Sequence, residues 1–374
     1  MACATFLILA SGASAMAESN LPVLQVKGLK VDYPTKKGVV HAVGGISFDV
    51  LAGEIVALVG ESGCGKSACA HAILRLISAP GQVPEGEVFF AGEDLLKVSE
   101  ERIRQIRGRH ISMVFQEPMS SLNPVQRIGN QVAEPLLQHK RFNKAEAWQK
   151  ASELLERVNI PDPEARLYDY PHQFSGGMRQ RVMIAIAMAC NPQLIIADEP
   201  TTALDVTVQA QIIDLLKQAA LADATGVLLI THNLGVVARY ADRVNVMYGG
   251  EIVESASADE LYANPQHPYT LGLLNSVPSL DLAAGERLIP IAGQPFDALN
   301  PPEGCSFHPR CPQVMDRCKT LAPSTTTLEG SHKVRCWLAN VAPVVEPHTV
   351  TLAKPSLGLG MGLSTAFIDK SATC

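Results

Sequence analysis

The hydrophobic pattern of the chain predicts an α/β protein. Apolar residues run without polar alternation through 55–59, 194–197 and 228–230, as is typical of short strands buried on both faces of a parallel sheet. Residues 68–77, which follow the first run, have a helical composition. Strands therefore alternate with helices along the chain, and we expect a mostly parallel core sheet.

A compact helical insert is predicted between Gln116 and Ser175. Helical patterns occupy 129–139 and 144–158. Because proline ends or kinks a helix, a long coiled-coil arm is excluded here. Prolines interrupt the segment at positions 118, 124, 135, 161, 163 and 171.

The composition fits a globular chain with a sizeable core. Of the 374 residues 47% are hydrophobic and only 5% are aromatic, and the formal net charge is −6. An acidic chain has no overall basic field that would recruit nucleic acid. The candidate basic patch is the cluster of Arg102, Arg104, Arg107 and Arg109, which we interpret as a solvated helix face or docking surface.

The two ends of the chain carry little interpretable chemistry. No stretch approaches the roughly 20 continuous apolar residues that span a bilayer. Residues 1–20 imitate a secretory signal, with a short apolar run and Ala-Met-Ala at 15–17. No Lys or Arg precedes Lys27, however, so we interpret them as a loose extension. We expect the tail from Val341, which is rich in Pro, Ala, Gly and Thr, to be poorly ordered.

The most specific motif is GESGCGKS at residues 60–67. It fits G-x-x-x-x-G-K-S and lies where the strand 55–59 turns into a helix, the setting of a phosphate-binding loop. Its backbone N–H groups wrap phosphates, Lys66 reaches the β- and γ-phosphates, and the Ser67 hydroxyl can ligate Mg²⁺. The loop assigned to the nucleotide comprises Gly60, Glu61, Ser62, Gly63, Cys64, Gly65, Lys66 and Ser67.

An acidic pair supplies the second half of a phosphoryl-transfer site. The run PQLIIADEP ends an apolar strand in Asp198 and Glu199. Asp198 is suited to hold Mg²⁺, directly or through water, and Glu199 to polarise the attacking water. Such a strand end is common on its own, but together with the phosphate-binding loop it indicates hydrolysis of a nucleotide.

The segment 174–181, FSGGMRQR, resembles the signature motif of the ATP-binding cassette (ABC) ATPases. It lies just ahead of the acidic strand, as in that family, and the resemblance covers about residues 22–340. The resemblance implies that ATP is the nucleotide, that Gln116 also binds Mg²⁺, and that Glu199, His232 and Gln116 are catalytic. Four further positions match marks of the family. They are Tyr33 for the aromatic that stacks on adenine, Gln116 for the glutamine loop, Asp205 for the D-loop in TTALD, and His232 for the switch histidine.

The signature departs from the usual family pattern at two positions. Phe174 replaces leucine, and Met178 stands where glutamine is commonest, but the phosphate-contacting part, Ser175, Gly176 and Gly177, is intact. In the family two ATPase domains face head to tail, and each ATP lies between one domain's phosphate loop and the other's signature. The resemblance thus implies that one chain holds two half-sites, which ATP brings together across a dimer.

Three longer segments narrow the resemblance to the ATPase subunits of bacterial dipeptide and oligopeptide importers: 117–136, 197–216 and 264–278. These peripheral motor subunits work on the cytoplasmic face of the inner membrane. The resemblance implies as partners a second ATPase subunit, expected to be a non-identical paralogue, two membrane-spanning permeases and an extracytoplasmic solute-binding protein. Residues 119–123 and their neighbours would receive the permeases' coupling helices.

Two other classes of function stay open at this point. A soluble ABC ATPase acting on nucleic acid or ribosomes is the main alternative, although such proteins usually fuse two cassettes and this chain has one. A redox sensor or binding module whose cassette only binds nucleotide is disfavoured by the presence of both Glu199 and His232. Peptides are the substrate favoured by resemblance, but nickel chelates, glutathione and sugars travel through close relatives.

Four of the nine cysteines gather near the C-terminal end as Cys-x5-Cys-x6-Cys-x17-Cys: Cys305, Cys311, Cys318 and Cys336. A cytosolic chain has little use for two disulfides, so metal binding is the better interpretation. The spacing differs from that of ordinary zinc sites and of bacterial ferredoxins. Some dipeptide-importer ATPases hold a 4Fe–4S cluster on four such cysteines, and by this resemblance we favour that cluster, with Arg310 and Arg317 offsetting its charge. Zinc and no metal are the alternatives.

The resemblance divides the chain into four parts. Residues 1–21 form an extension, 22–260 the nucleotide-binding domain, 261–340 a C-terminal domain of the oligopeptide/dipeptide-transporter type with the cysteines, and 341–374 the tail. Within the second part we expect a P-loop NTPase core, an antiparallel β element carrying Tyr33, and a helical signature subdomain at about 117–175.

Overall fold

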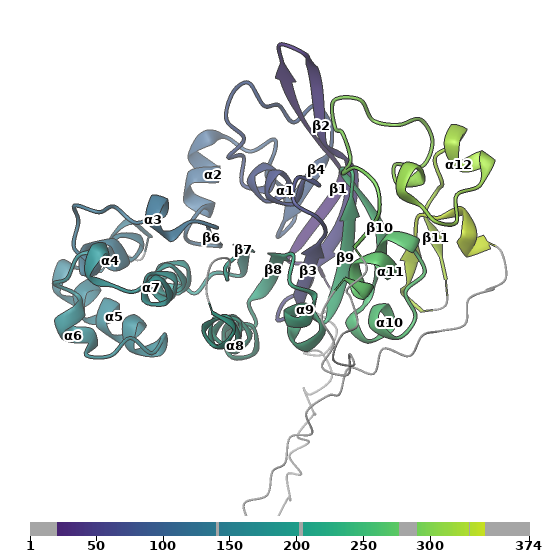
Figure 1. The fold of residues 1–374 in the computed structure, drawn as a ribbon. Coiled ribbons are helices and arrows are strands. Elements are labelled where there is room, and N and C mark those ends of the chain that lie inside the picture. Colours follow the sequence, from purple (N-terminus) through teal and green to yellow (C-terminus); the bar gives the residue numbers. More distant parts are fainter. Residues whose placement is uncertain (1–20, 140–141, 202–204, 277–289, 329, 341–374) are drawn as a thin grey trace, which may run out of the picture.

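The computed structural model describes residues 21–139, 142–201, 205–276, 290–328 and 330–340. The expected N-terminal extension up to residue 20, the expected tail 341–374 and residues 202–204 of the TTALD segment lie outside the described residues. Two sheets and a set of helices make up the described part (Figure 1). The predicted α/β class is confirmed.

An eight-stranded sheet forms the centre of the fold, in the order β11-β12-β10-β9-β3-β8-β7-β6. The predicted buried parallel strands are confirmed, since every residue of β3, β7 and β8 is buried. Their apolar side chains have helices or the second sheet on either face, which explains the absence of polar alternation. The parallel part comprises β9 (Arg243–Tyr248), β3 (Ile55–Val59), β8 (Gly226–Thr231), β7 (Leu194–Asp198) and β6 (Ile111–Val114).

The far side of this sheet is antiparallel and is completed by residues from near the C-terminal end. Strand β10 (Glu251–Ser257) pairs with β9, and β12 (Lys333–Val334) pairs with β10 and with β11 (Thr326–Thr327). A segment more than 70 residues further along the chain thus extends the same sheet. The C-terminal region therefore shares a hydrogen-bonded sheet with the strands of residues 22–260, the part predicted to bind nucleotide.

A four-stranded antiparallel sheet supplies the expected β element with Tyr33. Tyr33 lies on the first strand, and the two sheets are joined where the Gly44 N–H donates to the Gly250 carbonyl at 2.7 Å. In Figure 1 the first two strands form the long hairpin at the top. The order is β2 (Gly38–Val50), β1 (Leu24–Thr35), β4 (Glu87–Phe90) and β5 (Glu93–Asp94).

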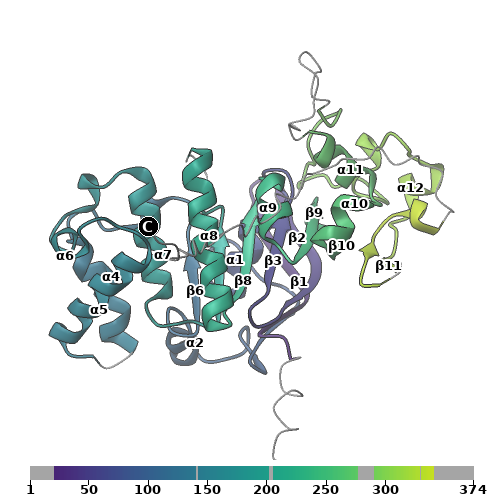
Figure 2. The ribbon, with the colours of Figure 1, turned by 90° about the horizontal axis from the view of Figure 1, so that it is seen from below.

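The predicted helical insert forms a lobe on one side of the sheet, opposite the C-terminal region (Figures 1 and 2). Helices α4 (Ile128–His139) and α5 (Lys144–Arg157) match the predicted 129–139 and 144–158 within one residue. Asn143 begins α5 with a capping box to Glu146. The remaining elements of the lobe are α3 (Pro118–Ser121), α6 (Pro163–Arg166), the 3₁₀ turn η1 (Pro171–Gln173) and α7 (Gly176–Met188).

One predicted helix has different bounds. The helix expected at 68–77 is α1 (Lys66–Ile73), which begins inside the phosphate-loop motif and ends four residues early. It ends because Leu74 leaves the helical conformation and Arg75 has a left-handed φ of +53°. The other helices of the core are α2 (Glu100–Ile106), α8 (Val206–Asp223) and α9 (Leu234–Tyr240). In the part of the chain that the structure describes, no helix has both the length and the apolar character needed to cross a membrane.

The C-terminal region is anchored by an aromatic cluster against β9. Tyr269 and Phe307 are fully buried, and both rings contact Tyr248 of β9, with centroids 4.6 and 5.1 Å away. Burying two aromatic side chains contributes several kcal/mol to docking of the region. Its short elements are α10 (Ala258–Ala263), α11 (Pro268–Asn275), η2 (His308–Arg310), α12 (Asp316–Thr320) and η3 (Trp337–Asn340).

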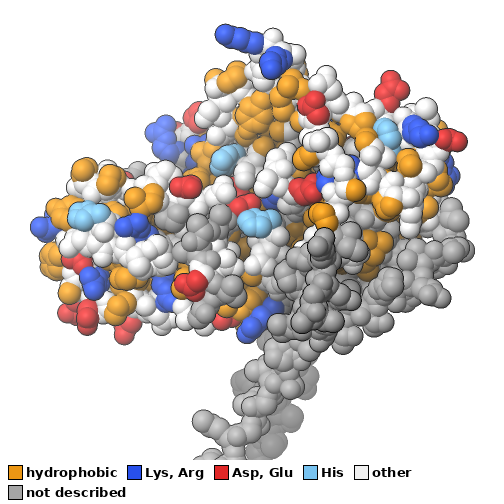
Figure 3. All heavy atoms as spheres, in the orientation of Figure 1, with side chains coloured by type: hydrophobic (Ala, Val, Ile, Leu, Met, Phe, Trp, Pro, Cys, Tyr) orange, Lys and Arg blue, Asp and Glu red, His pale blue; other side chains and the backbone are white. Residues whose placement is uncertain are grey.

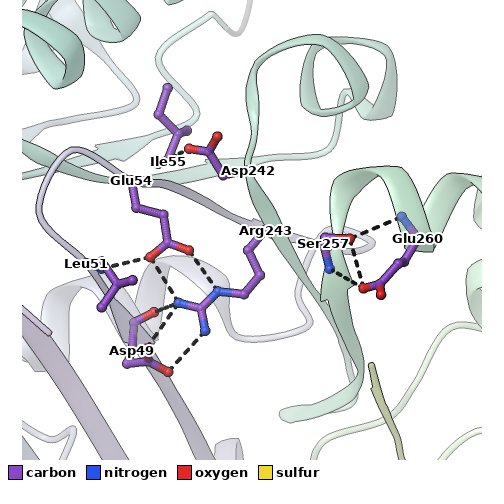
Figure 4. Close-up of polar contacts among 8 residues, drawn as sticks. All are labelled: Asp49, Leu51, Glu54, Ile55, Asp242, Arg243, Ser257 and Glu260. Carbon is purple, nitrogen blue, oxygen red and sulfur yellow. Dashed lines mark hydrogen bonds and ion pairs between the residues drawn. The ribbon is translucent and has the colours of Figure 1, made fainter. Parts of the chain in front are cut away.

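A polar clasp fixes the start of β9 beside the start of β3 (Figure 4). The Arg243 guanidinium lies between two carboxylates, donating to Glu54 at 2.9 Å and to Asp49 at 3.2 Å. Next to it, the Ile55 N–H donates to the Asp242 carboxylate at 2.8 Å. These contacts link the β2–β3 turn to a strand almost 190 residues away and so help to set the position of β3.

The basic cluster of α2 is partly used within the fold. Arg102 donates to the Glu93 carboxylate at 2.9 Å, and Arg107 donates to the carbonyl oxygens of Leu74 and Arg75 at 2.9 and 3.0 Å. Arg104 and Arg109 are exposed. Two of the four arginines therefore brace α2 against neighbouring elements.

A buried histidine predicts how stability depends on pH. His267 is 1% exposed, its Nδ1 accepts from the Tyr269 N–H, and burial lowers its pKa from 6.5 to about 4, although the neighbouring Glu254 opposes this shift. Below pH 6.5 this imidazole is protonated in the unfolded chain, whereas in the folded chain it stays neutral until about pH 4. The free energy of unfolding should therefore decrease across this range as the pH falls.

Replacing His267 with Asn keeps a side-chain acceptor at the start of α11 and removes the titration. Urea unfolding of the subunit at several pH values between 7 and 4 should show a shallower loss of stability for His267→Asn than for the wild type. The exposed His172→Asn serves as the control. Equal pH slopes for His267→Asn and the wild type would contradict the assignment.

Candidate functional site

The parallel strands bring four separate segments of the chain to one edge of the sheet. In the order β6-β7-β8-β3 the strands are neighbours and run the same way, so their carboxyl ends meet (Figure 1). Gln116 follows β6, the acidic pair ends β7, His232 follows β8 and the loop 60–67 follows β3. The predicted site residues are therefore adjacent because of strand direction, although up to 172 positions separate them in the chain.

The phosphate-binding loop curls around its own lysine. Lys66 is 5% exposed, and its Nζ donates to the carbonyl oxygens of Gly60 and Glu61, both at 2.9 Å. Ser62 and Gly63 are exposed at the tip, whereas Cys64 is buried, which raises the pKa of its thiol. Helix α1 begins at Lys66, so its N-terminus lies at the loop and favours a bound anion.

Two glycines of the loop are required by close contacts with neighbouring backbone. A Cβ on Gly60 would lie 2.2 Å from the Met247 carbonyl oxygen, and a Cβ on Gly65 would lie 2.1 Å from that of Ala42. Gly65 also has a φ of +104°. The motif therefore contains glycine at these positions because β9 and β2 press against the loop.

The structure brings together two of the predicted Mg²⁺ ligands. The Ser67 hydroxyl donates to Asp198 Oδ1 at 3.0 Å, across 131 positions of sequence. Asp198 is 3% exposed, and burial raises the pKa of its carboxyl. A hydroxyl and a carboxylate side by side at the phosphate loop form an oxygen donor set of the kind that Mg²⁺ prefers.

The three predicted catalytic residues meet at Glu199. Gln116 Nε2 donates to Glu199 Oε2 at 3.1 Å, and His232 Nδ1 lies 3.4 Å from Glu199 Oε1. Glu199 has a left-handed φ of +47°, and its N–H donates to the Ile230 carbonyl. The strained backbone is held by the adjacent strand and turns the carboxylate toward its two partners.

The signature residues lie apart from the loop of the same chain. Ser175 caps α7, where its Oγ accepts from the Met178 N–H at 3.3 Å. Ser175 and Gly176 are exposed, and Gly177 backs onto Val208 of α8. Helix α7 stands in the helical lobe, to one side of α1 (Figures 1 and 2). The exposed N-terminus of α7 and the phosphate loop therefore lie apart within a single chain.

Asp205 and Tyr33 lie on other elements. Asp205 caps α8, where its carboxylate accepts from the Val208 N–H at 3.0 Å. Tyr33 is half-buried on β1 with its ring against Gly81, and burial raises the pKa of its hydroxyl. These two residues are not among the side chains that meet at Glu199.

The four cysteines of the C-terminal region surround one apolar pocket, which His267, Phe307 and Trp337 also line. None of the four is in a disulfide, and the Cys305 N–H donates to the Cys318 carbonyl at 2.8 Å. Burial raises the pKa of Cys336 to about 11 and also raises those of Cys305 and Cys311. Within the described ranges, no three or more His, Cys, Asp or Glu residues are placed so that together they could hold a metal ion.

Two residues that touch the phosphate loop had no signal in the sequence. The Tyr269 hydroxyl accepts from the Glu61 N–H at 2.9 Å, and Arg310 forms two bonds to the Glu61 carboxylate. Arg310 was expected beside the cysteine cluster, offsetting its charge, and the structure instead directs its guanidinium to the loop. Arg317 lies over the Trp337 ring and donates to the Trp337 carbonyl. A separation of 249 residues leaves no local pattern that would reveal the pairing of Arg310 with Glu61.

The close contacts of the loop predict unequal effects of two similar substitutions. Gly65→Ala should lower the free energy of unfolding by roughly 2–4 kcal/mol, because the left-handed φ and the clash with Ala42 act together. Gly63→Ala is the matched control, since its φ is +82° but nothing lies within 4 Å of the added Cβ. It should cost about 1 kcal/mol. Urea unfolding of both variants tests this, and equal losses would contradict the contact.

Comparisons with known proteins agree with this geometry. The family model described as ABC transporter matches residues 43–202, and the model described as Oligopeptide/dipeptide transporter, C-terminal region, matches residues 253–318. The chain is 50% identical over 317 residues to the dipeptide transport ATP-binding protein DppD of Bacillus subtilis, covering 84% of this chain and 94% of that protein. It is 48% identical over 334 residues to the oligopeptide transport ATP-binding protein OppD of the same organism, covering 89% and 93%.

Solved structures show the same cassette fold. The dimeric structure of MJ0796, described as a bacterial ABC transporter cassette, matches with a TM-score of 0.57 and 30% identity, over 63% of this chain and 98% of that chain. The structure of cbiO1 from Clostridium perfringens, described as part of the ABC transporter complex cbiONQ, matches with a TM-score of 0.56 and 26% identity, over 65% and 91%.

Proposed function

The chain belongs to the ABC transporter family, among the ATP-binding subunits of dipeptide and oligopeptide transporters, and we propose that it is the ATP-hydrolysing motor of a peptide importer. The observation that carries the proposal is the meeting of Gln116 and His232 at Glu199, beside a phosphate loop whose Ser67 is bonded to Asp198. The alternative of a soluble ATPase acting on nucleic acid or ribosomes is less well supported, since the similar proteins carry transport names.

Hydrolysis follows from the positions of the chain's own side chains. Lys66 and the backbone N–H groups of the loop bind the phosphates of ATP, and Ser67, Asp198 and Gln116 would hold Mg²⁺, which neutralises phosphate charge when bound. Glu199 accepts a proton from the attacking water. Gln116 and His232 keep its carboxylate pointed at the site, which the contacts of 3.1 and 3.4 Å support.

A complete site requires a second ATPase subunit. Ser175, Gly176 and Gly177 stand at an exposed helix N-terminus apart from the loop, and this supports a role in binding the γ-phosphate held by the partner. The similar MJ0796 cassette is described as dimeric, in a post-hydrolysis state bound to ADP and Pi. We propose that ATP closes such a dimer, in which Asp205 and Tyr33 also contribute, and that the partner is a non-identical paralogue.

The helical lobe is the proposed docking surface for two membrane permeases. Exposed apolar side chains lie on and near the segment after Gln116, and Figure 3 shows hydrophobic side chains on the surface of the lobe. Met119 is 61% exposed and Val125 80%, in agreement with a site that a partner covers. The complex, completed by an extracytoplasmic solute-binding protein, would hold the subunit at the cytoplasmic face of the bacterial inner membrane.

We also propose that Cys305, Cys311, Cys318 and Cys336 hold a 4Fe–4S cluster rather than zinc. Their convergence on one apolar pocket supports a shared ligand, and four thiolates are the donor set that such a cluster needs. The raised pKa values of three of these thiols mean that a bound metal would have to displace protons, so loading should weaken as the pH falls.

Glu199→Gln tests the catalytic assignment. The amide keeps the size of the side chain but cannot accept a proton, so ATP hydrolysis by the assembled transporter should fall by at least about 100-fold. ATP binding should be retained, because the loop and Ser175 are unchanged, and closed dimers should accumulate in size-exclusion chromatography with ATP. Normal hydrolysis by this variant would refute Glu199 as the base.

Iron and acid-labile sulfide assays of anaerobically purified protein test the cluster, together with visible absorption. The wild type should contain both elements, and Cys311→Ser should lose them. The buried cysteine at position 190 lies outside the pocket, so Cys190→Ser is the matched control and should keep both. A colourless, iron-free wild type holding zinc would end the cluster proposal.

A further inference from the structure

We propose that Arg310 positions the phosphate-binding loop through Glu61, so that the cysteine-bearing segment of the C-terminal region sets the affinity of the subunit for ATP. The inference rests on the proposed function, because it assumes that this loop binds ATP. It assigns to Arg310 a positioning role, since its guanidinium acts through Glu61, a residue of the loop.

The ion pair has the geometry of a rigid clamp. Arg310 Nη1 lies 2.6 Å from Glu61 Oε2, and Nη2 lies 3.1 Å from Oε1. The Arg310 side chain is only 5% exposed and that of Glu61 is 32% exposed, so water reaches the pair from the Glu61 side alone. Paired N–H groups facing both oxygens of a carboxylate fix orientation as well as distance.

Two further hydrogen bonds hold the guanidinium in place. Nε donates to the Ala292 carbonyl at 3.1 Å, and Nη2 donates to the Ile291 carbonyl at 3.2 Å. The group also lies over the Tyr248 ring, 5.9 Å from its centroid. Four hydrogen bonds and an aromatic ring therefore restrict the orientation of the guanidinium. Through its two bonds to Arg310, the Glu61 carboxylate is restricted as well.

Glu61 is held by its backbone as well. Its N–H donates to the hydroxyl of the fully buried Tyr269, and its carbonyl accepts from Lys66 Nζ at 2.9 Å. One residue thus links the C-terminal region to the lysine that binds the phosphates. A shift of Glu61 would move both the start of the loop and the carbonyl that orients Lys66.

The charges of Glu61 and Arg310 also support a role of Arg310 in ATP binding. Glu61 places a carboxylate in a loop that binds a highly anionic ligand, and the buried Arg310 offsets this charge at contact distance. Removing Arg310 leaves the carboxylate uncompensated beside the phosphates. Loss of positioning and loss of charge compensation both predict weaker binding of ATP.

The clamp is part of the cysteine-bearing segment. Arg310 ends η2 and immediately precedes Cys311, and the same turn is tied to Cys305 by the His308 N–H, which donates to the Cys305 carbonyl at 3.0 Å. A change in the conformation of residues 305–311 therefore displaces the guanidinium. Because coupling between two sites is reciprocal, ATP binding must favour the conformation of this segment that keeps the clamp closed.

A double-mutant cycle in the assembled transporter tests the proposal. Arg310→Met should raise the KM for ATP about tenfold, equivalent to about 1.4 kcal/mol, and leave kcat within about twofold. In the Glu61→Gln background the same change should alter KM by less than about twofold, because its partner is already lost. Titration of each isolated subunit with ATP should show the same pattern in Kd.

Arg335→Met is the matched control. Arg335 forms an ion pair with Glu251 at 3.1 Å in the same region without touching the loop, so its loss should leave the KM for ATP unchanged. Arg310→Lys keeps the charge but cannot form the two-pronged contact, and it should recover only part of the affinity. Melting temperatures of all variants separate a general loss of stability from a change at the loop.

Three results would overturn the inference: an unchanged KM for Arg310→Met, a fall in kcat alone, or an equal rise in KM with and without Glu61→Gln. Failure of the proposed function is distinguishable, because the wild-type complex itself would then hydrolyse no ATP. A wild type that hydrolyses ATP beside an Arg310→Met variant with the same KM rejects only the role of Arg310.

Discussion

The parallel pairing of β3 with β8 on one side and β9 on the other is the constraint on which the site depends. It places the end of β3 beside Met247 of β9, whose carbonyl leaves room only for glycine at position 60. A slip of one residue would move each side chain of β3 to the opposite face of the sheet and remove this fit. The Arg243 clasp and the Asp242 bond to Ile55 oppose such a slip from the opposite end of the strands.

The pairing of the parallel strands also sets the surroundings of the two acidic residues at the edge of the sheet. Asp198 and Glu199 are consecutive but have different surroundings: Asp198 ends a buried strand beside Ser67, while the left-handed turn at Glu199 directs its carboxylate to Gln116 and His232. This difference in surroundings supports the two tasks proposed for the adjacent carboxylates, one toward a cation and one toward water. The C-terminal region braces this machinery, through the β10–β12 pairing, the buried Tyr269 and the Arg310 contact with the loop.

Much of this arrangement could be read from local sequence, because the signals are local. Uninterrupted apolar runs identified β3, β7 and β8, and helical periodicity identified α4 and α5 to within one residue. The end of α1 was missed, since nothing in its composition reveals that Arg75 adopts a left-handed conformation. The placement of Arg310 was also missed. Its neighbours in sequence are cysteines, and only the docking of η2 against β9 turns it toward Glu61.

By itself, the sequence determined the fold class, the phosphate loop, the acidic pair and the identity of the family, since each depends on residue types at short, fixed spacings. The tertiary structure decided which of these residues meet. Gln116, Glu199 and His232 come together because parallel strands share one carboxyl edge, whereas Ser175 stays apart on α7. It also decided that four cysteines line one pocket next to a segment that holds the phosphate loop. Such contacts join residues up to 249 positions apart, and their geometry is set by packing and strand order, which no local pattern encodes.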